Sequence, residues 1–407
     1  MKPLDTKNPV LVLNCKLGGL AIMRSLGILG IRVWGVDPEP KAPGFLSRYC
    51  KGKFIKKFDE TSPFDYLDFI LGLGKVLGKG TVLVPTSDDL SVFVAEHADV
   101  LKEYFLFPRN SPRIVQNLVS KEGMYHLAKQ HGVPVPETEF PKCLEDVTAY
   151  ADRASYPIML KGIDGNRLQE RTGRKMTIVR TRLELVETYK VLEDPDRPNL
   201  MLQEYIPGGD DQIYIFNGYF DQHSDCLCGF TGNKIRQFPV HVGCASLGIC
   251  RSIPEVSDMT KKFMKDIGYR GILDIGYRWD DRSGKYKVLD INPRIGQAFR
   301  LFVAENGMDV ARCLYMDLTG QKQTEPVIPR EGRRWVIEDY DIISSYHYYR
   351  ENNLRFLEWA RSFRDVEEAA WFRWNDPLPF LYMLSGLTER SLRWIGKSVR
   401  IRQARTS

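Results

Sequence analysis

The most informative stretch of the sequence is Leu289-Asp290-Ile291-Asn292-Pro293-Arg294, or LDINPR in one-letter code. It ends a predicted strand, and a turn at Ser283-Gly284-Lys285 joins that strand to an earlier one, 272–279. Asp290 and Asn292 are two residues apart, so they project from the same face of the strand. Because strand interiors disfavour Asp, an acid in this apolar setting indicates a functional site rather than a solvated hairpin.

The partner strand supplies a second acid, Asp274, in the segment GILDIG that begins at Gly271. Pairing across the hairpin brings Asp274 to Asp290 and Asn292. Two carboxylates and one amide oxygen suit Mg²⁺, which also takes phosphate oxygens and keeps some waters. Arg294 follows directly, where a guanidinium can stabilise charge developing on a transferred phosphoryl group. The sequence therefore predicts a metal-dependent phosphoryl-transfer site.

A second motif spans 201–211, MLQEYIPGGDD, in which a predicted strand enters a Pro-Gly-Gly bend followed by acids. Such an extended segment can offer backbone donors and acceptors to adenine, and Asp211 can accept from ribose hydroxyls. Upstream, Lys161 ends an apolar strand, where burial favours a partner such as phosphate. Residues 163–174 carry several arginines and glycines, which predicts a flexible cationic lid; a solvated loop is the alternative.

The N-terminal part predicts alternating strands and helices. The apolar run 10–14, the glycine pair Gly18-Gly19, a helical segment and the strand 32–37 form a β-turn-α-β unit. The glycines allow a tight turn or an anionic ligand at a helix N-terminus. Thr86-Ser87-Asp88-Asp89 follows the strand 81–85 and either contacts substrate or caps a helix.

Together these motifs resemble the ATP-grasp superfamily over about residues 10–320. The order along the chain is Ser120-Lys121, then Lys161-Gly162, then Gln203-Glu204-Tyr205-Ile206-Pro207-Gly208, then Asp274, then Asp290-x-Asn292-Pro293-Arg294. The resemblance implies that the chain uses ATP with Mg²⁺, as two ions and with Mn²⁺ as an alternative. Many members carry Glu at the two acidic metal positions, where this chain has Asp.

The resemblance also assigns roles to individual residues. Lys121 and Lys161 would hold the ATP phosphates. The segment Gln203, Glu204, Tyr205 and Ile206 would lie at the nucleotide, with Glu204 and Ile206 meeting adenine largely through backbone and Asp211 meeting ribose. Asp274, Asp290 and Asn292 would bind Mg²⁺, and Arg294 would assist phosphoryl transfer.

Within the superfamily, the segments 232–237 and 243–246 are similar to predicted carboxylate–amine ligases, including those that resemble D-aspartate ligase and the carbamoyl-phosphate synthase large subunit. Lys234 and Arg236 alternate along a predicted strand and would face one way, toward substrate or toward solvent. The resemblance implies C–N bond formation through an acyl-phosphate on an amino acid or small peptide, with Lys234 and Arg236 counted among the catalytic residues. A non-catalytic ATP-binding regulator, and a carboxylase or phosphotransferase on the same fold, are the alternatives.

Composition agrees with a large globular protein. The chain has 407 residues, 43% hydrophobic and 27% charged, and a net charge of +6, which does not favour nucleic acid as a partner. No signal-peptide or transmembrane pattern occurs, and eight scattered cysteines suit a reduced compartment, so a cytoplasmic protein is expected. Its partners would be small-molecule carboxylate and amine substrates, and the resemblance adds a homodimer.

The predicted fold class is α/β plus α+β. It comprises a Rossmann-like pre-ATP-grasp domain (1–115), an ATP-grasp fold with a lid subdomain (116–207) and a metal or catalytic subdomain (208–320), and a helical C-terminal extension (321–407). The extension is rich in aromatic residues, which indicates either a helix packed on the body or an interfacial helix. The basic run from Arg390 to Arg405 is either a solvated tail or a contact for an anionic surface.

Overall fold

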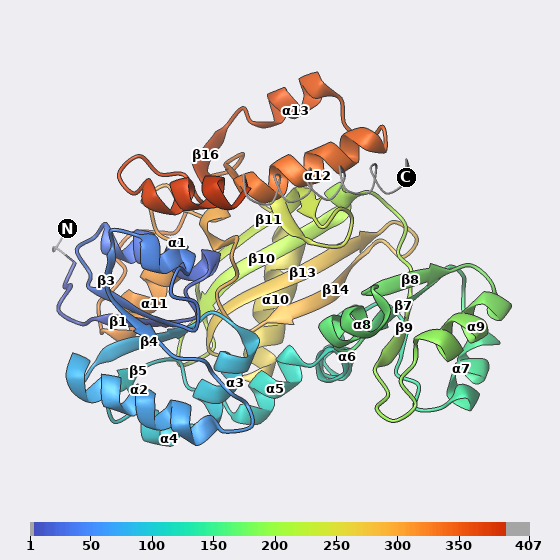
Figure 1. The fold of residues 1–407 in the computed structure, drawn as a ribbon, viewed down its shortest axis with the longest axis horizontal. Helices are drawn as coiled ribbons and strands as arrows, with labels where there is room; N and C mark the ends of the chain where they lie inside the picture. The colour runs from blue at the N-terminus through green and yellow to red at the C-terminus, as the bar shows by residue number, and fades with distance from the viewer. Residues whose placement is uncertain (1–3, 388–407) are drawn as a thin grey trace, which may run out of the picture.

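The structure is a computed structural model that describes residues 4–387. Three sheets organise these residues, and each gathers its own helices (Figure 1). The predicted mixture of α/β and α+β regions is confirmed. No helix within the described range is long and apolar enough to cross a membrane.

The first sheet is parallel, with strand order β3-β2-β1-β4-β5. Its strands are β1 (Val10–Leu13), β2 (Val33–Asp37), β3 (Cys50–Ile55), β4 (Thr81–Pro85) and β5 (Phe105–Leu106), and its helices are α1 (Leu17–Gly27), α2 (Pro63–Leu77), α3 (Asp88–Glu96) and α4 (Ala98–Leu101). β1 is apolar throughout and fully buried, as helices on both faces of a parallel sheet require. β1 pairs with β4, so the segments after these two strands meet at one edge.

The second sheet is antiparallel, with strand order β6-β9-β7-β8. Its strands are β6 (Thr138–Glu139), β7 (Ile158–Gly162), β8 (Met176–Val179) and β9 (Leu200–Glu204). The helices of this part are α5 (Pro112–Val119), α6 (Lys121–Gln130), α7 (Leu144–Ala151), α8 (Gly165–Thr172) and α9 (Arg182–Leu192). Of these, α7, α8 and α9 pack an apolar core of their own with the sheet, whereas α5 and α6 contribute Leu118, Met124 and Ala128 to a core shared with the third, seven-stranded sheet.

The prediction of a flexible loop at 163–174 is wrong for most of that segment, which forms α8. The Asp164 side chain caps the helix by accepting from the N–H groups of Asn166 and Arg167, and Gly173 ends it in the left-handed region at φ +74°. Arg167 and Arg171 donate to backbone carbonyls of residues 197 and 192. These two arginines therefore bond other parts of the lid subdomain and are not free to bind a ligand.

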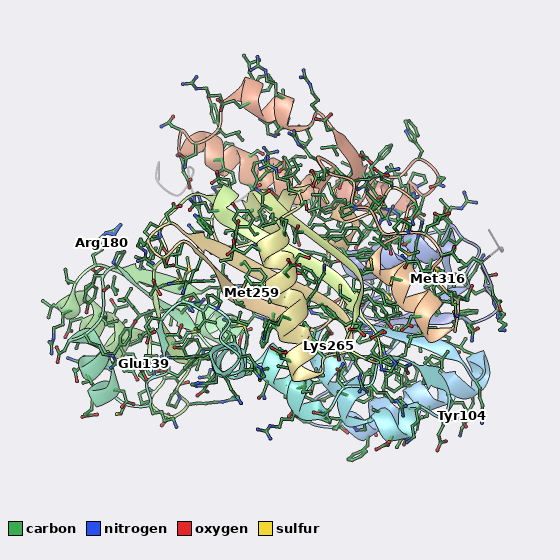
Figure 2. All side chains as sticks on the ribbon, turned by 180° about the vertical axis from the view of Figure 1, so that it is seen from behind. Tyr104, Glu139, Arg180, Met259, Lys265 and Met316 are labelled. Carbon is green, nitrogen blue, oxygen red and sulfur yellow. The ribbon has the colours of Figure 1, made fainter. Side chains whose placement is uncertain are left out.

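The third sheet has seven strands in the order β14-β13-β10-β11-β12-β15-β16. They are β10 (Ile213–Phe220), β11 (Cys226–Phe238), β12 (Cys244–Cys250), β13 (Gly271–Asp280), β14 (Lys285–Asn292), β15 (Arg334–Val336) and β16 (Val366–Ala369). The helix α10 (Pro254–Ile267), labelled at Met259 and Lys265 in Figure 2, lies across the back of this sheet. The other face is covered in part by the helix α11 (Val310–Leu318), and the rest of it lines a cleft.

The C-terminal extension is helical as expected, with α12 (Glu338–Arg350), α13 (Phe356–Ser362) and a helix at 378–387, and it follows α11 (Val310–Leu318). It also adds β15 and β16 to the edge of the seven-stranded sheet, which the sequence did not predict. Asp376 docks it on the first sheet's helices, because its carboxylate accepts from Arg24 Nε at 2.8 Å and Ser47 Oγ at 2.7 Å, all buried. The predicted basic run, Arg390 to Arg405, lies outside the described residues.

Candidate active site

A cleft of about 2000 Å³ lies where the three sheets face one another. Its walls include all of the residues that the sequence selected: Lys121, Lys161, Gln203, Glu204, Tyr205, Ile206, Asp211, Lys234, Arg236, Asp274, Asp290, Asn292 and Arg294. These positions span more than 170 residues of sequence, so their convergence is a property of the fold. They differ in whether other protein groups already occupy their hydrogen-bonding atoms.

Two carboxylates and an amide form an oxygen-rich cluster on β13 and β14. Asp274 lies directly opposite Asn292, and Asn292 Nδ2 donates to Asp290 Oδ2 at 3.0 Å. Glycines leave room for both acids, because a Cβ at Gly276 would lie 2.4 Å from Asp290 Oδ1 and one at Gly296 would lie 2.6 Å from Asp274 Oδ2. The cluster therefore presents free carboxylate oxygens to the cleft.

The electrostatics of this cluster match a cation site. Burial, followed by the nearby charge of Asp290, raises the pKa of Asp274 from 3.8 to about 6. A bound cation would reverse that shift, since it favours the ionised carboxylate. Within residues 4–387 no group of three or more His, Cys, Asp and Glu residues is placed to hold a metal. Two carboxylates and an amide that leave room for phosphate oxygens and water fit Mg²⁺ better than a site made wholly of protein ligands.

Arg294 borders the cluster and is held from two sides. Its Nε and Nη2 donate to the two oxygens of Asp88 at 2.7 and 3.3 Å, and Nη2 also donates to Asn292 Oδ1 at 3.0 Å. In the described part of the chain Nη1 has no partner. The guanidinium is 20% exposed and Asp88 40% exposed, so the pair sits at the cleft surface. Arg294 is oriented by Asp88 and keeps one amino group for a ligand.

The sequence left two roles open for Thr86–Asp89, substrate contact and helix capping. The structure gives a third, because Asp88 begins α3 and pairs with Arg294, 206 residues later. Ser87 occupies the N-cap position without a side-chain bond, and Thr86 Oγ1 donates to the carbonyl of Asn14 at 2.7 Å. No local pattern could have found the Asp88 partner.

Two lysines face each other across the lid side of the cleft. Burial, then the positive charge of Lys121, lowers the pKa of Lys161 to about 8. Lys121 Nζ donates to the carbonyl of Gly162 at 2.7 Å, and burial lowers its pKa as well. Like charges this close are unfavourable until an anion joins them, so the pair is suited to phosphate.

The Glu204 carboxylate is fully engaged by protein. It accepts from Lys287 Nζ at 2.9 and 3.0 Å, from Arg282, and from the Glu137 N–H at 2.7 Å. Gln203 is likewise turned inward, and its Nε2 donates to Thr138 Oγ1 at 2.9 Å. The backbone N–H groups of Glu204 and Tyr205 are also engaged, because they donate to the carbonyls of Glu137 and Pro157, whereas the Ile206 N–H has no partner among residues 4–387. The sequence did not single out Lys287 or Arg282, which lie far along the chain.

The predicted basic pair on β11 is wrong for Arg236. The register shifts between Lys234 and Arg236, so the alternation along the strand is broken. Arg236 Nε and Nη2 each donate to Asp341 of α12 at 2.8 Å, and the side chains are 4% and 1% exposed. Its charge is neutralised inside the wall. Lys234 Nζ donates to the carbonyl of Gly243 at 2.7 Å and remains at the cleft.

Asp211 lies in the short helix η2 (Asp210–Gln212) and lines the cleft. Its backbone carbonyl accepts from Asn233 Nδ2 at 3.2 Å, while no other residue in 4–387 bonds its carboxylate. The neighbouring Asp210 is different, because it accepts from Tyr348 and from His241 Nδ1 at 3.1 Å. Of these two adjacent acids, Asp211 is the one free to meet a ligand.

A comparison of the sequence with those of known proteins finds a related enzyme. The chain is 23% identical over 291 residues to D-aspartate ligase of Enterococcus faecium (strain Aus0004), and the match covers 68% of each protein. The chain is therefore similar to a ligase over two thirds of the length of both proteins. No family model matches the sequence.

Solved structures show the same ATP-grasp fold. The biotin carboxylase domain of the Hydrogenobacter thermophilus 2-oxoglutarate carboxylase, in a complex with MgADP, ADP and bicarbonate, superposes with a TM-score of 0.61 and 17% identity, over 80% of this chain and 73% of that one. An L-amino acid ligase from Bacillus licheniformis gives a TM-score of 0.57 and 15% identity, over 81% and 76% of the two chains. The fold thus serves both carboxylation and ligation.

Proposed function

We propose that this ATP-grasp ligase joins a carboxylate to an amine through an acyl-phosphate, with an amino acid or small peptide as substrate. The observation that carries the proposal is the free set of groups beside Asp290, where carboxylate oxygens and the Nη1 group of Arg294 face one cleft. Such groups supply the charge complementarity that phosphoryl transfer to a carboxylate requires.

Some of the cleft residues would bind the nucleotide, and others would hold the metal ion. Lys121 and Lys161 would bind the ATP phosphates, the backbone at Glu204 and Ile206 the adenine, and Asp211 the ribose. Asp274, Asp290 and Asn292 would hold Mg²⁺, which would neutralise charge on the phosphates. We propose the subdomain boundaries at 115, 207 and 320; the first two sheets fall within the first two of these parts, whereas β15 and β16 of the seven-stranded sheet lie beyond residue 320.

The reaction would proceed in two displacements. A carboxylate oxygen of the substrate attacks the γ-phosphorus, the bond from that phosphorus to the bridging oxygen breaks, and ADP leaves. The amine nitrogen then attacks the acyl carbon, the bond from that carbon to the phosphate oxygen breaks, and phosphate leaves while the nitrogen gives a proton to solvent. Arg294 would orient and neutralise the transferring group in the first step, and Lys234 would steady the substrate carboxylate.

One other candidate function has a specific observation in its favour. The fold is shared with a carboxylase whose structure contains bicarbonate, so bicarbonate could take the place of the carboxylate substrate. The pairing of Arg236 with Asp341 removes one cation from the wall that would receive it. We therefore favour an organic carboxylate and treat bicarbonate dependence as the discriminating result.

The test is phosphate release from Mg-ATP with amino acids offered singly, in pairs and with bicarbonate. Asp290→Ala should abolish release and Arg294→Ala should lower it about 10²- to 10³-fold, whereas Arg180→Ala, at an exposed lid arginine, should match wild type. Release that requires one carboxylate and one amine supports the ligase. Release that requires bicarbonate favours the carboxylase. Binding of a non-hydrolysable ATP analogue with no release under any mixture would leave a nucleotide-binding regulator.

A further inference from the structure

Large apolar side chains on the surface are concentrated in the C-terminal extension. Residues 342–384 hold about half of those exposed in the described chain, although they form about a tenth of its length. The most exposed is Trp374, at 87%. A concentration of this kind marks a binding surface, whereas single exposed apolar residues elsewhere need no explanation.

Helix α12 carries one stripe of this surface. Ile342, Tyr346 and Tyr349 are spaced four and three residues apart, so they share one face of the helix, and each is more than half exposed. The opposite face, with Asp341 and Tyr348, is buried against β11 and the loop before η2 (Asp210–Gln212). The apolar stripe therefore faces away from the protein body.

The helix at 378–387 carries a second stripe. Leu378 and Leu381, three residues apart, are each more than half exposed, while Met383 on the other side enters the main core. Trp374 precedes the helix. Figure 1 shows this helix, in dark red, and α12 along the same side of the molecule. We call Ile342, Tyr346, Tyr349, Trp374, Leu378 and Leu381 the C-terminal apolar face.

The exposed charges of this part of the chain include several arginines. Arg350, Arg355 and Arg361 are exposed on α12, α13 and the turn between them. Of the exposed acids, Glu351 bonds His241 and Glu358 accepts from the Arg355 N–H, Glu367 pairs with Arg330 and Arg333, and Asp365 remains at the surface. The chain then continues from the helix at 378–387 into a run whose cations are Arg390, Arg393, Lys397, Arg400, Arg402 and Arg405, against the single acid Glu389.

We propose that the C-terminal apolar face docks on an anionic lipid bilayer as a peripheral, non-spanning contact. Tyr, Trp and Leu bordered by arginine is the composition of interfacial helices, in which apolar side chains enter the headgroup region and cations meet lipid charge. In the sequence, the basic run follows directly on the helix at 378–387, which carries one of the two stripes.

Vesicle sedimentation with the full chain tests the proposal. Vesicles of phosphatidylcholine with 30% phosphatidylglycerol should sediment the protein at about 0.1 M NaCl, and vesicles of phosphatidylcholine alone should not. The double variant Tyr346→Ser/Leu381→Ser should weaken binding at least about tenfold, since two apolar side chains are lost from the interface. Phe64→Ser/Val76→Ser removes two still more exposed apolar residues, both on α2, and should bind like wild type.

Three outcomes would overturn the proposal. The first is no sedimentation with anionic vesicles at low salt. The second is binding that Tyr346→Ser/Leu381→Ser leaves unchanged, which would mean a purely electrostatic contact outside this face. The third is a dimer in light scattering that the same variant dissociates, which would make a second copy the occupant. Thermal unfolding and phosphate release of each variant confirm that the body and the cleft are intact.

Discussion

The two halves of the open face of the seven-stranded sheet treat arginine in opposite ways. On the β13–β14 half, Arg294 pairs with a partly exposed acid and keeps Nη1 free. On the β11–β12 half, α12 closes over Arg236, whose Nε, Nη1 and Nη2 all have partners in Asp341 and Ser362. Both arginines line one cleft. The difference shows that a cation in a pocket wall serves chemistry only when its hydrogen-bonding capacity is not already used by the protein.

The largest expected effect is on stability, and it concerns Arg236 on the β11–β12 half, which we call the closed half because α12 covers it. Arg236→Ala would leave Asp341 buried without a cation and should lower the free energy of unfolding by about 3–5 kcal/mol. Chemical denaturation at constant pH measures this. The double change Arg236→Met/Asp341→Leu should recover much of the loss, because no unpaired charge remains. An Arg236→Ala protein of wild-type stability and no activity would break the comparison and restore Arg236 to the catalytic set.

On the β13–β14 half, which we call the open half, Arg294→Ala should lower activity and leave stability nearly unchanged. We expect phosphate release to fall about 10²- to 10³-fold, the magnitude seen when one preorganised donor is lost. Its unfolding midpoint should change little, since the ion pair with Asp88 is at the cleft surface. Arg180→Ala is the control for removal of an exposed arginine. Retained phosphate release would show that the free Nη1 group has no catalytic role.

Acid titration of Asp274 tests the open half without a substitution in the arginines. Because its pKa is raised to about 6, protons should compete with Mg²⁺, and the Mg²⁺ affinity should fall below pH 6, approaching tenfold per pH unit. In metal-free protein the neutral form is favoured, so the stability from this group is present below about pH 4 and is lost as pH rises through 6. Asp274→Asn should remove this pH dependence from metal-free thermal unfolding; an unchanged profile would contradict the assignment.

The smallest expected effect is at Asp88, which acts through Arg294. Asp88→Asn should lower the turnover rate about three- to tenfold, since one charged hydrogen-bond partner is weakened while the guanidinium stays in place. The KM for ATP should not change. Asp89→Asn, on the next residue of α3, is the matched control. A rise in KM without a change in turnover would mean that Asp88 contacts substrate directly.

The sequence predicted most of the cleft because strand-end motifs report local geometry. LDINPR and the strand before it place Asp274 opposite Asn292 through the register of one hairpin. The sequence also contains the residues that begin and end α8. Asp164 is typical of an N-cap and Gly173 of a left-handed C-terminus, so these two residues could have predicted the helix. These features depend on neighbours in sequence, so pattern and propensity suffice.

Long-range partners were not predictable in the same way. Asp88 meets Arg294 and Asp341 meets Arg236 only because separate elements converge, and each acid is unremarkable in its own segment. β15 and β16 are three and four residues long, too short to show a period, and they extend the sheet beyond β12 with β16 at its edge. Which polar groups remain open is therefore decided by tertiary packing.

The docking of Asp376 on Arg24 has a consequence for synthesis on the ribosome. The two residues are separated by 352 positions, so at ordinary elongation rates roughly 18–70 s pass between their emergence. During that interval a guanidinium destined for the interior has no carboxylate, and the first helix cannot reach its final environment. Nascent chains halted before Asp376 should therefore be recognised by chaperones and proteases, even though the parallel sheet that they already contain is complete.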